Sequence, residues 1–253
     1  MFKFYQWIKS LSLLVGVLLL FGCLIIVEKK YAKQRCKTLD IHIQNVGEQH
    51  FIDEKDIFAY LSEKYIAPLQ DAPIQQIKIT QIENIIKSHN FVRKCSVYKT
   101  WKGDIKINIL PKRVLARIIC PYGIDQYIDE LGELVPLSKS YTARVLLLDS
   151  VGLCNLENTL QSISYSKSIL KVLHLINKEP FWKAQITHIS VNKKGELTLT
   201  TLFNRQKIYL GKPEDIEKKM KKLMLFYKVI LPYKGWNAYK RINLKFDNQI
   251  VCE

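Results

Sequence analysis

Motifs that carry enzyme chemistry are scarce in this sequence. Only 10 of its 253 residues are glycines, and they form no phosphate-binding cluster. The serine-hydrolase elbow, the zinc-protease helix and the dinucleotide-binding fingerprint are also absent. The histidines are dispersed along the chain, at His42, His50, His89, His174 and His188. We therefore expect no catalytic residue, no cofactor and no metal site, and we predict that the protein is not an enzyme.

Cysteine pairs of the zinc-binding or redox type are missing as well. The chain has 6 cysteines but no C-x-x-C pair, and no histidine stands at a zinc-ligand spacing from such a pair. Cys23 lies in an apolar segment, which leaves an odd number of cysteines for pairing within one chain. We predict mostly reduced, half-buried thiols, although the sequence leaves their redox state open.

Dense basic runs are absent although the net charge is high. The chain has 39 lysines and arginines against 23 acidic residues, which gives a formal charge of +16. Such an excess favours an acidic neighbour such as nucleic acid or anionic lipid. The basic residues are scattered through every segment, however, and no RNA-binding signature occurs. We therefore expect no nucleic-acid partner.

Charge is completely absent from one segment near the N-terminus. Residues 11–27, "LSLLVGVLLLFGCLIIV", contain no charged side chain, and with Ile8 and Ser10 the segment nears the roughly 20 residues that span a bilayer. Tyr5 and Trp7 suit the membrane interface. We predict a cytoplasmic tail at residues 1–9, a single transmembrane helix at 10–27 and a juxtamembrane linker at 28–37.

This anchor has two alternatives, and its orientation in the membrane stays open. A cleaved signal peptide needs a small-x-small site, which does not follow the segment. A lipoprotein signal is a rival because Gly22 precedes Cys23, although the bulky Phe21 stands before them. The lysines and arginines after the segment outnumber the two before it, Lys3 and Lys9. Counted alone, these charges place the C-terminal body in the cytoplasm, but large domains also translocate despite such charges.

The first folded unit is predicted at residues 38–118. "LDIHIQN" alternates as a strand, and Asp53 with Asp56 marks the start of a helix. Thr80 and Glu83 form the capping box of a second helix. Residues 92–99 and 104–110 then alternate as two strands around the turn "TWKG". The order β-α-α-β-β predicts two helices on one face of a small sheet.

The second folded unit is predicted at residues 119–253. Asp129, Glu130 and Glu133 surround Gly132 between two apolar stretches, so we interpret them as a hairpin turn rather than a pair of catalytic carboxylates. A helix is expected within residues 162–182 with Pro180 beyond its end, three strands within 185–211, and a further helix from Glu214 to Ile230. The apolar stripe predicted for that last helix is Ile216, Met220, Leu223, Tyr227 and Ile230, and lysines 218, 219, 221 and 222 are expected to form a solvated face.

The chain ends in a stretch that alternates as a strand, "INLKFDNQIVCE", residues 242–253. Ile242, Leu244 and Phe246 share one face, and Asn243, Lys245 and Asp247 share the other. Which face lies inward stays open, because a shift of one residue exchanges the two faces. The same parity decides whether Cys252 is buried. We expect this strand to close the second unit at a sheet edge.

Several phrases resemble one protein family. The order β-α-α-β-β is that of a POTRA domain, and "FVRKCSVYKTWKGDIKINILPKRVLARI" (residues 91–118) resembles the FtsQ/DivIB bacterial division proteins, especially those of the Bacteroidetes type. In many members the last strand reads Asp-Leu-Arg-Tyr, where this chain has Asn243, Leu244, Lys245 and Phe246. The resemblance implies an α+β protein in which a transmembrane helix and a POTRA domain precede a mixed α/β "β domain" that ends in an edge strand.

The resemblance also implies a function and its partners. It implies a scaffold at the division septum, anchored in the bacterial inner membrane with a periplasmic body. The expected partners are FtsB- and FtsL-like coiled-coil proteins and, through them, the septal peptidoglycan synthase FtsW–FtsI. A partner strand would add to the last strand by β-augmentation. The candidate partner-binding residues are Ile242, Asn243, Leu244, Lys245, Phe246, Asp247 and Ile250.

Another function would share the physics of strand pairing. A POTRA-bearing envelope protein for polypeptide transport or outer-membrane assembly is the alternative. Such a protein should carry several POTRA units or a barrel of roughly 10-residue amphipathic strands. The single predicted unit and the long amphipathic helix near the C-terminus favour the scaffold. A third possibility is an envelope protein held by a lipid on Cys23.

Overall fold

The computed structural model describes residues 16–20, 22, 34–45, 47–65, 69, 71–121, 123–149 and 166–253. Residues 16–20 and 22 are helical, and the apolar side chains from Val17 to Leu20 are exposed. Among all the residues that the structure describes, no helix is both long and apolar enough to cross a membrane. Most of the predicted transmembrane segment, including Cys23, lies outside the described residues.

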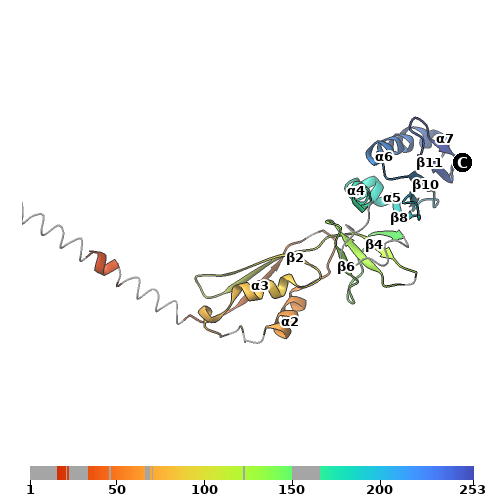
Figure 1. Ribbon diagram of the computed structural model, residues 1–253. Coiled ribbons are helices and arrows are strands. Elements are labelled where there is room, and N and C mark those ends of the chain that lie inside the picture. Colours follow the sequence, from red (N-terminus) through yellow and green to blue (C-terminus); the bar gives the residue numbers. More distant parts are fainter. Residues whose placement is uncertain are drawn as a thin grey trace, which may run out of the picture. The chain divides into compact units, whose positions relative to one another are not determined.

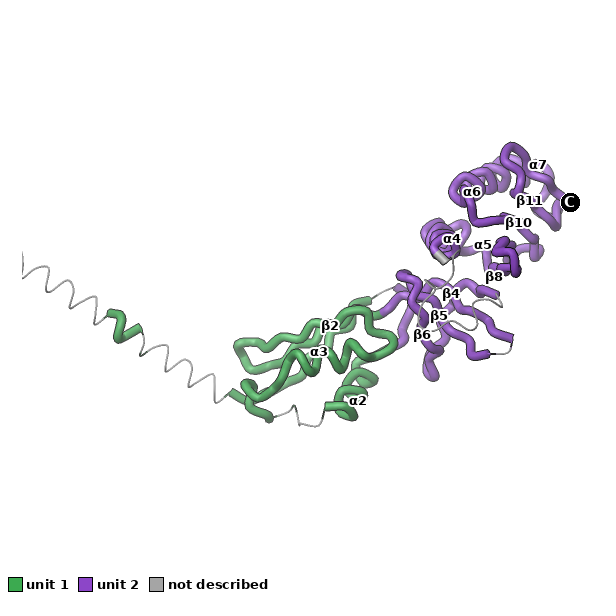
Figure 2. Tube along the Cα trace, viewed as in Figure 1, with its two compact units in different colours: residues 1–45, 52–111 green, residues 46–51, 112–253 purple. Residues whose placement is uncertain are grey.

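The chain divides into two compact units (Figure 2). The first holds residues 1–45 and 52–111, and the second holds residues 46–51 and 112–253. The expected domain boundary lay at 118/119. The difference arises because residues 114–119 form a strand that pairs within the sheet of the second unit.

The first unit has the expected order of elements (Figure 1). Its strands form a three-stranded sheet in the order β1-β3-β2, with β1 parallel and β2 antiparallel to the central β3. The two α-helices pack against the sheet, and a short 3₁₀ turn precedes the second helix. The elements are β1 (Leu39–Ile43), α2 (Glu54–Lys64), η1 (Ile74–Gln76), α3 (Ile79–Lys87), β2 (Val92–Lys99) and β3 (Ile105–Pro111).

The helix starts of this unit test the capping predictions. Asp53 caps α2 as expected: its carboxylate accepts the backbone N–H of Asp56 at 2.7 Å, and the Asp56 carboxylate accepts the N–H of Asp53. The predicted Thr80 cap of α3 is wrong. The helix begins at Ile79 after Lys78, which makes no side-chain capping bond. Alternating isoleucines of β3, which are fully buried, form the core together with one face of each helix.

The second unit is built on a nine-stranded sheet in the order β12-β11-β10-β9-β8-β7-β4-β5-β6. Its strands are β4 (Val114–Ile119), β5 (Gln126–Asp129), β6 (Leu134–Pro136), β7 (Leu146–Asp149), β8 (Ile186–Val191), β9 (Leu197–Thr201), β10 (Lys207–Gly211), β11 (Arg241–Asn243) and β12 (Val251–Cys252). Its helices are α4 (Ser166–Lys178), α5 (Pro180–Gln185), α6 (Ile216–Leu225), the π-helix η3 (Phe226–Ile230) and α7 (Leu231–Lys234).

The predicted helix 214–230 is therefore not one regular helix. The π turn of η3 takes more residues than an α turn, so it shifts the buried stripe by one position. Ile216, Met220, Leu223 and Tyr227 are buried as predicted, but Ile230 is exposed and Leu231 takes its place in the core.

Candidate partner-binding edge

The described C-terminal residues form two short strands rather than one long one. β11 covers only Arg241–Asn243 and lies inside the sheet, parallel to β10 on one side and antiparallel to β12 on the other. The chain then turns back, and β12 at Val251–Cys252 occupies the edge. The expectation of one continuous strand over residues 242–253 is thus wrong, whereas an edge strand does lie within this stretch, at β12. The sequence pattern missed the turn because residues 244 and 246 continue the apolar alternation.

Backbone hydrogen bonds show which groups of the edge face outward. The N–H of Arg241 donates to the carbonyl of Glu253 at 3.0 Å, and the N–H of Glu253 donates back to Arg241 at 3.0 Å. Ile242 faces Cys252 in the next pair. Because antiparallel pairs alternate between bonded and non-bonded, the N–H and C=O of Cys252 point away from β11. An incoming strand could pair with these groups.

The parity of the strand follows from burial. Ile242 and Leu244 are fully buried in the core of the second unit, and Ile250 and Cys252 pack against that core while partly exposed. The even-numbered set therefore faces inward up to Leu244. Phe246 leaves the pattern, with 48% of its surface exposed.

The remaining predicted site residues lie where the chain leaves β11. The Asn243 side chain accepts the N–H of Lys245 at 3.0 Å, which starts the turn. Asp247 is exposed in the loop. Of the seven predicted residues, the structure thus buries two in the core and places three in the loop, Lys245, Phe246 and Asp247, while Asn243 and Ile250 flank that loop.

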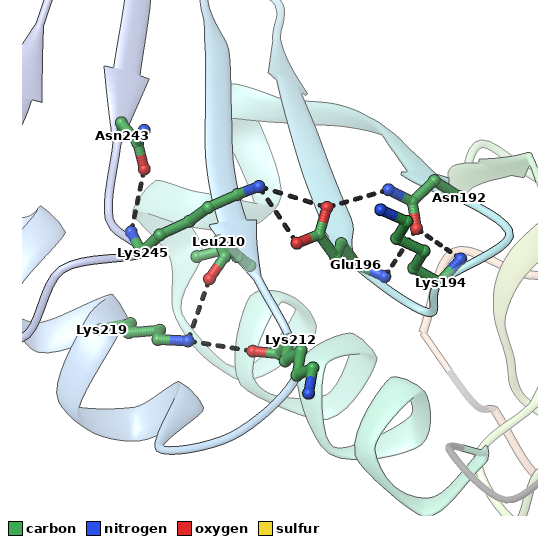
Figure 3. A network of polar contacts seen from close by, with 8 residues as sticks. All are labelled: Asn192, Lys194, Glu196, Leu210, Lys212, Lys219, Asn243 and Lys245. Atoms are coloured by element: carbon green, nitrogen blue, oxygen red, sulfur yellow. Dashed lines mark hydrogen bonds and ion pairs between the residues drawn. The ribbon is translucent and has the colours of Figure 1, made fainter.

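Lys245 is held within the second unit (Figure 3). Its ammonium contacts both carboxylate oxygens of Glu196, at 3.1 and 3.2 Å. Asn192 donates a further bond to Glu196 at 3.0 Å, and these bonds from Lys245 and Asn192 lower the pKa of that carboxyl. The Lys245 stem crosses Gly211 so closely that an added Cβ would lie 2.9 Å from its Cγ. The ion pair therefore ties the start of the loop to the β8–β9 turn.

Two lysines of α6 are also bonded rather than simply solvated. Lys219 donates to the carbonyls of Leu210 at 3.0 Å and Lys212 at 2.9 Å, where β10 ends (Figure 3). Lys222 donates to three carbonyls of the β11–β12 loop. Partial burial lowers the pKa of Lys222, while Asp247 opposes this shift. The predicted solvated face is wrong for these two positions.

A buried polar network supports the approach to β11. Gln206, which is 2% exposed, donates to the carbonyls of Trp236 at 3.1 Å and Tyr239 at 2.8 Å. The Tyr227 hydroxyl donates to the Gln206 side chain at 2.7 Å, and burial raises the pKa of Tyr227. No local sequence signal could pair Gln206 with residues 21 to 33 positions away.

The carboxylate cluster near residue 130 proves to be a turn. Asp129 is fully buried, and its side chain accepts the N–H groups of Leu131 and Glu133, both at 2.9 Å. Gly132 has a positive φ of 81°, as the hairpin requires. This geometry confirms the interpretation of these residues as a hairpin.

The described titratable groups form no group of three metal-ligating side chains. His174 lies 2.9 Å from the carbonyl of Glu130, and His188 lies 3.7 Å from Asp149. Among the described cysteines, Cys36, Cys95 and Cys252 are free, whereas Cys120 is disulfide-bonded. Three of the four described cysteines are thus free, as the prediction of mostly reduced thiols expects, and Cys120 is the exception among them.

Two family models together match most of the chain. A POTRA-like domain matches residues 34–110, and the model described as FtsQ/DivIB, C-terminal related matches residues 113–253, more than half of the chain. The chain belongs to the FtsQ/DivIB family. No curated protein matches it.

Membership of the FtsQ/DivIB family confirms the resemblance drawn from the sequence. The family is a non-catalytic scaffold family of cell division, and it associates with the division septum. The mixed α/β architecture with a POTRA-like unit agrees with this assignment.

Proposed function

We propose that this FtsQ/DivIB protein is a non-enzymatic, membrane-anchored scaffold that binds FtsB- and FtsL-like coiled-coil proteins. A strand of the partner adds to the outer side of β12, and through these partners the protein acts on the FtsW–FtsI synthase. The observation that carries the proposal is the outward N–H and C=O of Cys252 at the open edge of a nine-stranded sheet.

The side chains around this edge supply selectivity. Val251 of β12 and Phe246 of the β11–β12 loop are exposed, and an exposed aromatic ring suits an apolar side chain of an incoming segment. Lys245 is already paired with Glu196, so a partner carboxylate would have to compete for it. We therefore propose that the partner contacts Phe246 of the loop and β12 itself.

The proposed location is the inner membrane, with one span at residues 10–27 and a periplasmic body. The uncharged stretch from 11 to 27 supports the span. The disulfide at Cys120 supports an oxidising compartment, because such bonds are rare in the cytosol. Protease treatment of spheroplasts tests the orientation: digestion of the body supports it, and protection contradicts it.

The experiment for the proposed function is a deletion of residues 250–253 from the full-length chain, followed by pull-down of FtsB- and FtsL-like coiled coils. The deletion removes β12 but keeps the buried Ile242 and Leu244, whose loss would confound the result by unfolding. Val251→Thr is the control because it retains the backbone of β12. We expect the deletion to lose the partner and the control to keep it. Undiminished binding by the folded deletion variant refutes the proposal.

A further inference from the structure

One lysine of α6 reaches the loop that leads into β12. The Lys222 ammonium donates to the carbonyls of Phe246 at 2.6 Å, Asp247 at 3.2 Å and Gln249 at 3.1 Å. These three acceptors match the three donors of an ammonium group. We call this set of contacts the Lys222 clamp.

The loop has little else to hold it. Residues 245–249 are all exposed, so the loop buries little apolar surface. Ordering each residue of a loop costs conformational entropy, roughly 1–2 kcal/mol for the backbone alone. Apart from the Lys222 clamp, the described contacts at its start are the Asn243 turn and the Lys245–Glu196 pair.

β12 depends on this loop because the strand itself is short. It has two residues, and its ladder to β11 consists of the pairs of Ile242 with Cys252 and Asn243 with Val251, extended by the Arg241–Glu253 bonds. Two-stranded pairing of this length is weak unless its connection is ordered. A clamp that fixes the loop therefore also fixes the position of the edge.

We propose that Lys222 is a positioning residue for strand addition: it holds β12 against β11 so that the outward groups of Cys252 stand in register for a partner. The inference rests on the proposed function of this edge. When the clamp is lost, β12 is docked in a smaller fraction of molecules. The apparent affinity for the partner then falls in proportion to the docked fraction, because only the docked form can bind.

The test compares three full-length variants by hydrogen–deuterium exchange. Lys222→Met keeps the length of the side chain and removes the donors, and Lys222→Arg restores a charged donor group. Lys221→Met is the matched control, because Lys221 is the exposed neighbour on the same helix. We expect Lys222→Met to increase amide exchange in residues 246–253 by about tenfold, the order expected for lost charge-assisted bonds, while β8 and β9 stay unchanged.

The same variants are then titrated with an FtsB-like coiled coil. Lys222→Met should weaken binding by a similar factor, and Lys222→Arg and Lys221→Met should bind like the wild type. Unchanged exchange in Lys222→Met overturns the clamp. Increased exchange with unchanged affinity overturns its positioning role. If the wild-type chain binds no coiled coil, the proposed function fails instead, and the exchange data still decide whether the clamp holds β12.

Discussion

Replacement of Gly211 by alanine perturbs the end of β10, where the backbone contacts the side chain of Lys245 at the start of the β11–β12 loop. Gly211 has φ +70, in the left-handed region, and faces the stem of Lys245. A Cβ at this position would lie 2.9, 3.4 and 3.6 Å from Cγ, Cδ and Cε of Lys245. Because the first distance is shorter than ordinary van der Waals contact, the Lys245 stem has to move.

The cost of this change has two parts. A non-glycine residue in the left-handed region costs roughly 1–2 kcal/mol. Movement of Lys245 also separates its ammonium from the Glu196 oxygens, now at 3.1 and 3.2 Å. That pair lies at the surface with both side chains partly exposed, so its loss affects the loop position more than global stability. We therefore expect Gly211→Ala to lower the free energy of unfolding by about 1–2 kcal/mol.

The assay is urea unfolding of the purified full-length chain together with binding of an FtsB-like coiled coil. Gly235→Ala is the matched control: Gly235 also has a positive φ of +91, but nothing lies within 4 Å of its added Cβ. Both variants should lose stability through backbone strain, and Gly235→Ala at least as much, because its ψ of 143° lies outside the left-handed helical region. Only Gly211→Ala should also weaken partner binding. In a chain that already carries Lys245→Ala, adding Gly211→Ala should cause no further loss of binding. Equal binding by the two glycine variants refutes the reasoning.

Of three further predictions, two concern the support of the edge and one concerns Asp125 beside β4 and β5, near the other end of the sheet. Ile242→Ala, at a fully buried position of β11, should lower the unfolding free energy by about 2–5 kcal/mol in urea titrations, and an effect below 1 kcal/mol contradicts the proposed packing. Tyr227→Phe leaves the buried Gln206 oxygen without its 2.7 Å donor, so differential scanning calorimetry should show a loss of about 1–3 kcal/mol, against no loss if water replaces the hydroxyl. The third prediction concerns Asp125. Its carboxylate accepts the backbone N–H of Cys120 and a bond from the Arg117 guanidinium, and both bonds lower its pKa. This carboxylate therefore stabilises the fold above its ordinary pKa near 4, and the contribution fades as pH falls through the lower folded value. The stability difference between wild type and Asp125→Asn should be present at pH 7 and vanish once the pH falls below the lowered pKa of the folded state, and a difference independent of pH counts against the role of the charge.

Periodicity predicted the elements of the first unit well because each repeats a strong local signal. Residues 92–99 form a strand with the expected bounds, and Asp53 caps its helix. The capping box at Thr80 failed because helix α3 starts one residue before it. A capping pair of the right spacing is also compatible with the interior of a helix, so the pattern alone cannot fix the first residue.

The C-terminal strand was predicted in place but not in form. The alternation of Ile242 and Leu244 correctly indicated a buried strand, yet Phe246 continues that pattern into an exposed loop. The Asn243 side chain starts the turn, and a tertiary contact then holds the loop: Lys222 binds carbonyls 24 to 27 residues away in the sequence. Backbone carbonyls carry no residue identity, so a sequence pattern cannot reveal such acceptors.

The shift of the buried stripe in α6 has a similar origin. The helical period of 3.6 places Ile230 inward, but the π turn of η3 adds a residue and buries Leu231 instead. The hydrophobic pattern is compatible with both, because Ile230 and Leu231 are adjacent apolar residues. Packing against the sheet, rather than local preference, decides between them.

The central claim is that a partner strand pairs with the outward backbone of β12. Cys252→Pro tests it most directly, because proline removes the outward N–H of residue 252 and leaves the inward bonds of residues 251 and 253 to β11 in place. Cys252→Ala removes the same thiol but keeps the N–H. Calorimetric titration of both folded variants with an FtsB-like coiled coil should show wild-type affinity for Cys252→Ala and a loss of at least tenfold for Cys252→Pro. Equal affinity of the two variants would contradict strand addition at β12.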